Sequence, residues 1–241
     1  MKSDEGVPAT HHFVDYGTLA GGYRQLHAGV FQLLLQDVPA QLTGTAALVS
    51  PASTTPFPFL LSRLTSHRPL YLADPSHEDL ELQRSLVGDD QAIYLASGVA
   101  ELPDSPTGLG IVLNPFGLQH WTVEAPLYAS AVRKRSRDDG RLFTLDWGIT
   151  RYPEDLAGLP GIAEEVHFSE AALLSPYGPE TGWRLLGERE IAFGLEHSVE
   201  DIAARLHGDH AELLRAAARH RQRSRIVIGA SVIYRLYEGI A

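Results

Sequence analysis

The chain has 241 residues, of which 44% are hydrophobic, and 20 Lys and Arg against 30 Asp and Glu give a formal net charge of −10. This composition is ordinary for a globular protein and excludes a disordered or fibrous chain. The negative charge repels nucleic acid and anionic lipid, so we expect neither as a partner. The absence of cysteine excludes disulfides and zinc–thiolate sites. With no long apolar run and no secretion signal, we expect a cytoplasmic location.

The N-terminal part divides into a loose stretch over residues 1–12 and a helical cover over residues 13–37, where apolar positions recur at helical spacing. Five short segments follow that are apolar along almost their whole length, a pattern typical of strands buried on both faces of a parallel sheet. These segments are "TAALV", "LYLAD", "AIYLA", "GIVLN" and "RLFTLDW".

Helix signals lie between these strands. Ser76 is expected to cap a helix over residues 77–87 that Gly88 ends. Thr55 is a second N-cap, before a helix whose first turn tolerates proline because amides there lack partners within the helix.

The last third of the chain changes character. Residues 150–183 are punctuated by proline and glycine and predict a covering insertion, while residues 183–195 and 225–238 alternate as a late antiparallel strand pair. Capping boxes predict two helices between these strands, from Ser198 with Asp201 and from Asp209 with Glu212. With no linker evident, we expect one domain over residues 1–241.

This order of elements resembles the class I S-adenosylmethionine-dependent methyltransferase family. "YLADPSHEDLELQRSLVGDDQAIYLASGVAELP" is similar to the family's second and third strands with the helix between them, and "GIVLNPFGLQHW" is similar to its fourth strand and following turn. The resemblance implies an α/β, Rossmann-like methyltransferase fold. It implies a mostly parallel seven-stranded sheet with a late antiparallel strand pair and a helical N-terminal cover.

The first cofactor motif departs from the family. There, a glycine-rich turn lets the backbone approach the cofactor, whereas this chain has "SPASTTPFPF" and no glycine between Gly44 and Gly88. If the cofactor is retained, the resemblance assigns Asp74 to its ribose and Ser53 to the turn. An Asp before a proline also serves as an ordinary turn residue, so both readings of Asp74 stay open.

Candidate site residues follow the carboxyl ends of the strands, where open α/β sheets bind ligands. We expect catalysis from His120, whose imidazole exchanges protons near neutral pH, and from Tyr16 and Tyr23 of the N-terminal helices. The expected substrate-binding residues are His27, Asn114, Gln119, Trp121, Trp147, Tyr152 and Tyr177. The alternatives are turn packing for His120 and Trp121, core packing for His27, Tyr16 and Tyr23, and an exposed loop position for Tyr177. No metal site is expected.

Three functions follow. The loss of glycine favours a methyltransferase-like enzyme that needs no cofactor. Because some members of the family that this chain resembles have been diverted to other reactions, the resemblance implies cyclisation, rearrangement or dehydration of a small apolar metabolite in secondary metabolism. One alternative is an active S-adenosylmethionine-dependent small-molecule methyltransferase with a variant first motif. The other is a non-catalytic methyltransferase-like subunit. The expected partner is a small-molecule substrate, with a homodimer or pairing with a homologous enzyme left open.

Overall fold

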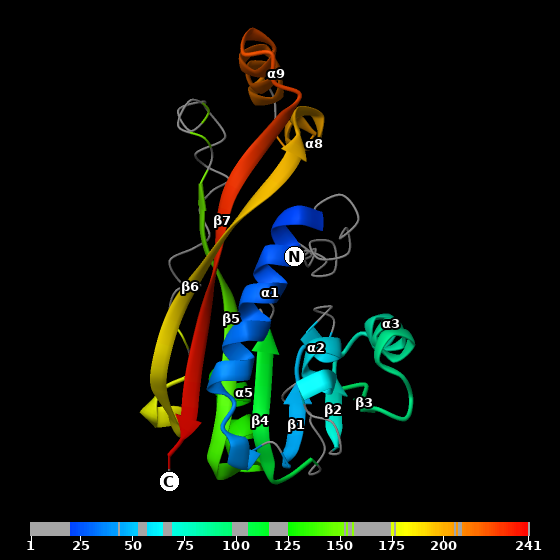
Figure 1. Ribbon diagram of the computed structural model, residues 1–241, viewed down its shortest axis with the longest axis vertical. Coiled ribbons are helices and arrows are strands. Elements are labelled where there is room, and N and C mark those ends of the chain that lie inside the picture. Colours follow the sequence, from blue (N-terminus) through cyan, green and yellow to red (C-terminus); the bar gives the residue numbers. More distant parts are fainter. Residues whose placement is uncertain are drawn as a thin grey trace, which may run out of the picture.

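The computed structural model describes residues 20–42, 44–52, 57–64, 69–97, 106–115, 125–151, 153, 156, 175, 177–204, 206 and 209–240. Seven strands form one sheet in the order β3-β2-β1-β4-β5-β7-β6 (Figure 1). The strands are β1 (Ala46–Val49), β2 (Leu70–Ala73), β3 (Ile93–Leu95), β4 (Leu109–Pro115), β5 (Ser136–Arg151), β6 (Trp183–Ser198) and β7 (Arg225–Gly239). The first five are parallel, and β7 runs antiparallel to both of its neighbours.

This topology confirms the predicted fold, and every predicted strand is present. The difference lies in length: β5 was expected over residues 141–147 but spans Ser136–Arg151. It begins where Ser136 pairs with Leu109 of β4, and it continues to pair with β7 beyond the end of β4. Burial explains the sequence pattern, since all seven residues of β4 are buried.

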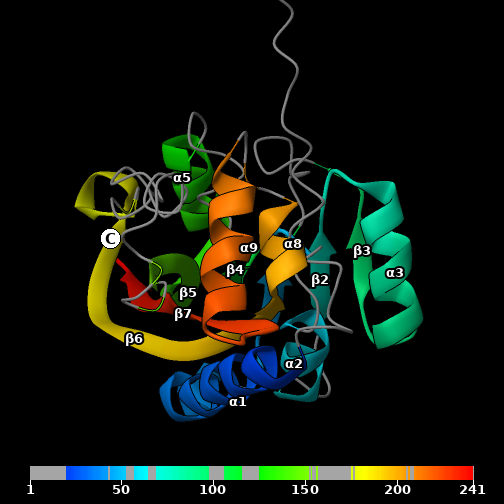
Figure 2. The ribbon, with the colours of Figure 1, turned by 90° about the horizontal axis from the view of Figure 1, so that it is seen from above.

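Helices cover both faces of the sheet, with α1 and α2 on one side and α5 on the other (Figure 2). The helices are α1 (Ala20–Asp37), α2 (Phe57–Leu64), α3 (His77–Val87), α5 (Ala125–Arg135), α8 (Val199–Ala203) and α9 (His210–His220), with short 3-10 turns η2 (Ala40–Leu42) and η5 (Pro179–Thr181). Among these helices, none combines the length and apolarity that crossing a bilayer requires.

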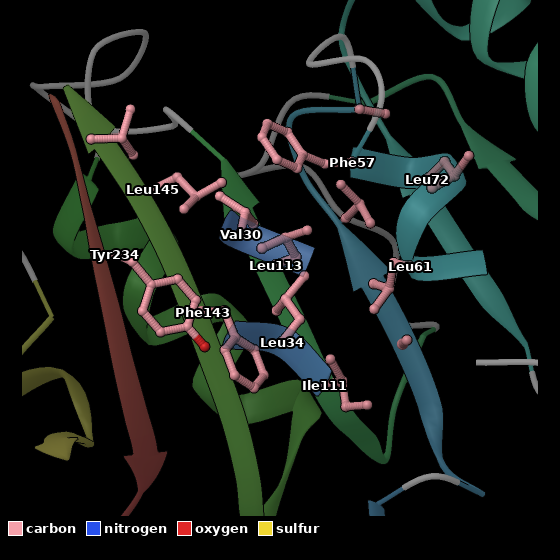
Figure 3. Packing of buried hydrophobic residues seen from close by; sticks show 14 of the residues in the cluster. Val30, Leu34, Phe57, Leu61, Leu72, Ile111, Leu113, Phe143, Leu145 and Tyr234 are labelled. Atoms are coloured by element: carbon pink, nitrogen blue, oxygen red, sulfur yellow. The ribbon is translucent and has the colours of Figure 1, made fainter. Parts of the chain in front are cut away.

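Alternate residues of each central strand face opposite helices. On the α1 and α2 side, Val30, Phe57, Leu113 and Phe143 belong to the largest hydrophobic cluster (Figure 3). On the α5 side, a second cluster contains Val112, Tyr128, Leu142 and Trp183. We call these sides the α1 face and the α5 face. Because both are covered, the strands are apolar throughout and not alternating.

Some of the predicted helix caps are present in the structure, and one is not. Ser76 caps α3, its Oγ accepting the amide of Asp79 at 3.2 Å, and Gly88 ends the helix with a φ of 101°. The capping box of Ser198 with Asp201 is also confirmed. The second predicted box is wrong, because Asp209 has helical backbone angles and its side chain caps nothing, whereas an N-cap normally needs an extended backbone.

The N-terminal cover is confirmed for α1, which packs against the antiparallel strands. Gly29 permits this close approach, since a Cβ there would lie 3.2 Å from the Cγ2 of Ile191 on β6. At the end of α1, Asp37 accepts a hydrogen bond from Tyr234 at 3.0 Å and pairs with Arg189 at 3.5 Å. These contacts fix where α1 places its side chains over the sheet.

The two long strands continue past the rest of the sheet as an arm, residues 195–228. The last pair between β5 and β7 is Arg151 with Gly229, so beyond it β6 and β7 pair only with each other in the described ladder. The arm carries α8 and α9, which lie beyond the carboxyl ends of the central strands (Figures 1 and 2). A separate hydrophobic cluster holds it together, formed by Leu156, Val199, Ile202, Ala203, Leu206, Leu214, Ala218, Ile226 and Ile228.

Candidate functional site

The carboxyl end of β2 presents a buried carboxylate. Asp74 is 3% exposed, and its Oδ1 accepts the backbone amide of Ser76 at 2.8 Å. Its own amide donates to the carbonyl of Leu95 on β3 at 3.1 Å. The turn role expected of this residue is therefore present, and it fixes the carboxylate at the carboxyl end of β2.

Two serine hydroxyls flank this carboxylate at the ends of the neighbouring strands. Ser50 follows β1 and Ser97 lies just beyond β3, and the Oγ of each is buried and forms no hydrogen bond to the part of the chain that the structure describes. Buried polar atoms are nearly always paired in native proteins. A nucleoside, with its hydroxyl and amino groups, offers partners of the required kind, so these strand ends fit such a cofactor.

Asn114, at the end of β4, is the centre of a buried hydrogen-bond network on the α5 face. Its Nδ2 donates to the carbonyl of Ser50 at 2.5 Å and to the hydroxyl of Tyr128 at 3.2 Å. Its Oδ1 accepts the hydroxyl of Tyr177 at 2.8 Å. Both ends of the side-chain amide are thus engaged by the protein, which ties the end of β1 to β4 and α5.

Tyr177 is 5% exposed, which excludes the exposed loop position that the sequence left open. Its ring contacts those of Tyr128 and Tyr237, with centroids 6.4 Å and 5.4 Å away. Burial raises its pKa well above the usual value for tyrosine. It therefore stays protonated and serves as a hydrogen-bond donor.

A charged cluster crosses the same face on β5, β7 and β6. Arg235 lies between two carboxylates, with Nη1 3.0 Å from Asp146 Oδ2 and Nε 2.6 Å from Glu188 Oε2. Asp146 is 1% exposed, and its burial raises its pKa to about 7 despite the attraction of Arg235. Asp146 was expected near the pocket because it follows the fifth predicted strand, whereas Arg235 and Glu188 were not among the expected site residues. The sequence signal was a charged residue inside each of two mostly apolar strands, Asp146 in "RLFTLDW" and Arg235 in "RIVIGASVIYRLYE".

His27 and Trp147 lie on the opposite, α1 face. His27 stands edge-on to Phe57, with ring centroids 5.6 Å apart, and burial lowers its pKa to about 4. Trp147 packs against Phe193 at 6.1 Å. The expected substrate-binding residues are therefore divided by the sheet: His27 and Trp147 on one face, Asn114 and Tyr177 on the other.

The remaining expected residues cannot be placed. Tyr23 lies within α1, but its side chain is outside the described residues. The others outside them are Tyr16, Ser53, Gln119, His120, Trp121 and Tyr152, together with Thr55 and most of residues 150–183. Over the described ranges, no three His, Asp or Glu side chains are grouped as metal ligands would be.

Several solved structures are similar in fold to this chain. A predicted type II methyltransferase from Anaeromyxobacter dehalogenans superposes with a TM-score of 0.59 at 12% identity, covering 86% of this chain and 94% of its own. A predicted methyltransferase from Bacillus halodurans gives 0.58 at 14% identity, over 88% and 100%. The YcgJ protein from Bacillus subtilis gives 0.56 at 11% identity, over 89% and 100%. No protein-family model matches the sequence, and no curated protein matches it.

These likenesses establish the class I methyltransferase fold and correct one expectation. The glycine-free turn predicted that the chain uses no cofactor, but structures that share its fold over nearly their whole length are named as methyltransferases, whose fold class uses S-adenosylmethionine. The prediction of a protein without a cofactor is therefore wrong. Nothing among these neighbours supports a cyclase.

Proposed function

We propose that the protein is an S-adenosylmethionine-dependent methyltransferase that acts on a small molecule. The observation that carries this proposal is the buried carboxylate of Asp74 at the end of β2 in a sheet of the 3-2-1-4-5-7-6 order. In an open α/β sheet, the carboxyl ends of the strands are where ligands bind. The cofactor would supply an electrophilic methyl group, and the chain would bind it and orient the acceptor.

The residues present suit such a cofactor at three strand ends. Asp74 would accept hydrogen bonds from the ribose hydroxyls, which a carboxylate does more strongly than a neutral acceptor. Ser50 and Ser97 would pair their buried hydroxyls with polar groups of the same ligand. Together these side chains offer contacts that do not depend on a glycine-rich turn.

The α1 face carries a group of aromatic rings. The rings of His27, Phe57, Trp147 and Phe193 lie on this face. With a pKa of about 4, His27 is neutral at pH 7. It can therefore donate or accept a hydrogen bond without adding positive charge. These ring contacts pack α1 against α2 and β5 against β6, on the face opposite to Asn114 and Tyr177.

Calorimetric titration of strand-end variants tests the proposal. Asp74→Asn removes the charge while keeping the shape, and we expect it to weaken S-adenosylmethionine binding about tenfold or more. Ser97→Val should weaken binding by a smaller factor. The matched control is Asp138→Asn, because Asp138 lies near the amino end of β5 with its side chain 96% exposed. Equal affinity in the Asp74 and Asp138 variants would refute the assignment of the ribose to β2.

A further inference from the structure

Asp146 presents a buried oxygen at a strand end where a ligand is expected. The parallel pairing of β4 with β5 ends at Pro115 and Leu145, so Asp146 lies just past the carboxyl end of β4. Its Oδ2 is held by Arg235 at 3.0 Å and by the hydroxyl of Thr144 at 3.4 Å. Its Oδ1 is buried and accepts no hydrogen bond from any described residue.

The charges around Asp146 favour one kind of partner. Arg235 is shared between Asp146 and Glu188, so two carboxylates face one guanidinium and the ionised cluster has an excess negative charge. An anionic ligand would be repelled there, whereas an ammonium or hydroxyl group would give Oδ1 the donor that it lacks.

Nearby tyrosines do not supply that donor, since their hydroxyls are bound elsewhere. Tyr177 donates to Asn114, and Tyr237 is 2.6 Å from the hydroxyl of Ser175. Asp146 nevertheless affects both tyrosines, since its charge helps to raise the pKa of each. Both rings lie on the α5 face, as Asp146 does, and they contact each other with centroids 5.4 Å apart.

We propose that Asp146 is the substrate-anchoring residue, whose Oδ1 accepts a hydrogen bond from the hydroxyl or ammonium group of a small aromatic substrate. This inference rests on the proposed methyltransferase function, because hydroxyl and amino groups are also methyl acceptors. It narrows the substrate class to neutral or cationic protic molecules and excludes carboxylates and phosphates at this position.

The ionisation of Asp146 adds a pH dependence. Burial raises its pKa to about 7, and the charged or titratable groups that face it are Arg235, Glu188, Tyr177 and Tyr237. Asp146 changes its charge near neutral pH, whereas burial keeps Tyr177 and Tyr237 protonated there. Affinity for an ammonium donor should therefore fall as the pH decreases through about 7.

Three probes that share one ring test the proposal: benzylamine, benzyl alcohol and benzoate. In ligand-observed NMR titrations at pH 8, benzylamine or benzyl alcohol should bind at least about tenfold more tightly than benzoate. Asp146→Asn should remove this preference. The control Asp138→Asn removes a carboxylate whose side chain is 96% exposed, and should change affinity less than about threefold.

Each other result overturns the inference. If benzoate binds as well as benzylamine, or if the Asp146→Asn variant keeps the preference, Oδ1 binds an internal water only and does not anchor a substrate. The inference would also be refuted if none of the three probes binds at about 10 mM, because most fragments that fit a site bind more tightly than this. S-Adenosylmethionine titrations of the same proteins separate the two proposals, because Asp146→Asn should bind the cofactor like the wild type.

Discussion

The side-chain amide of Asn114 donates to the backbone carbonyl of Ser50 over 2.5 Å and so joins the ends of two adjacent parallel strands. Tyr128 donates to the same carbonyl at 3.3 Å, and Tyr177 donates to the other end of the amide. One side chain thus connects the turn after β1, the strand end of β4, helix α5 and the segment at residue 177. Ser50, one of the proposed cofactor-binding residues, is thereby connected to the hydrogen-bond network on the α5 face.

Replacing this amide should therefore affect stability strongly. We expect Asn114→Ala to lower the free energy of unfolding by about 2–4 kcal/mol, because it leaves buried hydroxyl and carbonyl groups without partners. Tyr177→Phe removes only one of these hydrogen bonds and should cost about 1 kcal/mol. Urea unfolding measures both, and similar small losses in the two variants would contradict the central role of Asn114.

His27 predicts a loss of stability in acid. Its pKa is lowered to about 4 by burial, whereas the unfolded chain titrates near the usual 6.5, so the folded state binds fewer protons between these values. Stability should decrease by about 2 kcal/mol as the pH falls from 7 to 4. His27→Gln should remove this component, as measured by urea unfolding across that range. An unchanged pH slope in the variant would show that His27 is solvated.

Asp146 predicts the opposite pH dependence of stability. Its folded pKa of about 7 lies above the unfolded value, so its contribution is fully present at low pH and is lost as the pH rises through about 7. The loss should be on the order of 2–4 kcal/mol, and Asp146→Asn should abolish it. The comparison is the difference in unfolding free energy between wild type and variant at pH 4 and pH 8. A difference that does not change with pH would mean that Asp146 stays ionised.

The arm should unfold in part without the rest of the sheet, because its hydrophobic cluster is separate. Leu214 is fully buried in that cluster, whereas the adjacent Leu213 is 43% exposed. We expect Leu214→Ala to cost about 2–4 kcal/mol and Leu213→Ala less than about 0.5. Hydrogen exchange should accelerate in α8 and α9 while β1 and β4 remain protected. Equal acceleration in the central strands would show that the arm and sheet unfold together.

The sequence predicted elements well where the signal is local. Ser76 and Gly88 mark the ends of α3 because capping depends on neighbouring backbone groups. Asp209 has the same local signal, yet its backbone is helical and it caps nothing. The strands were found because burial on both faces leaves them apolar throughout.

The candidate site was harder to predict because it depends on which face each side chain takes. Asn114 lies near the end of β4, and Trp147 lies in β5 just beyond the end of β4. Their side chains nevertheless lie on opposite faces of the sheet, because side chains alternate along a strand. Nothing in a strand of continuous apolar residues identifies which face meets which helix. The pairing of Asp146 with Arg235 needed the order of β5 and β7 in the sheet as well as their sequences.

The central claim is that the strand ends bind S-adenosylmethionine although the first turn has no glycine. A calorimetric titration of the wild-type protein with S-adenosylmethionine tests it most directly. The account predicts one site per chain with a dissociation constant in the micromolar range, roughly −8 kcal/mol of binding free energy, and weaker binding by Asp74→Asn. No heat of binding at millimolar ligand, in a protein shown to be folded, would contradict it.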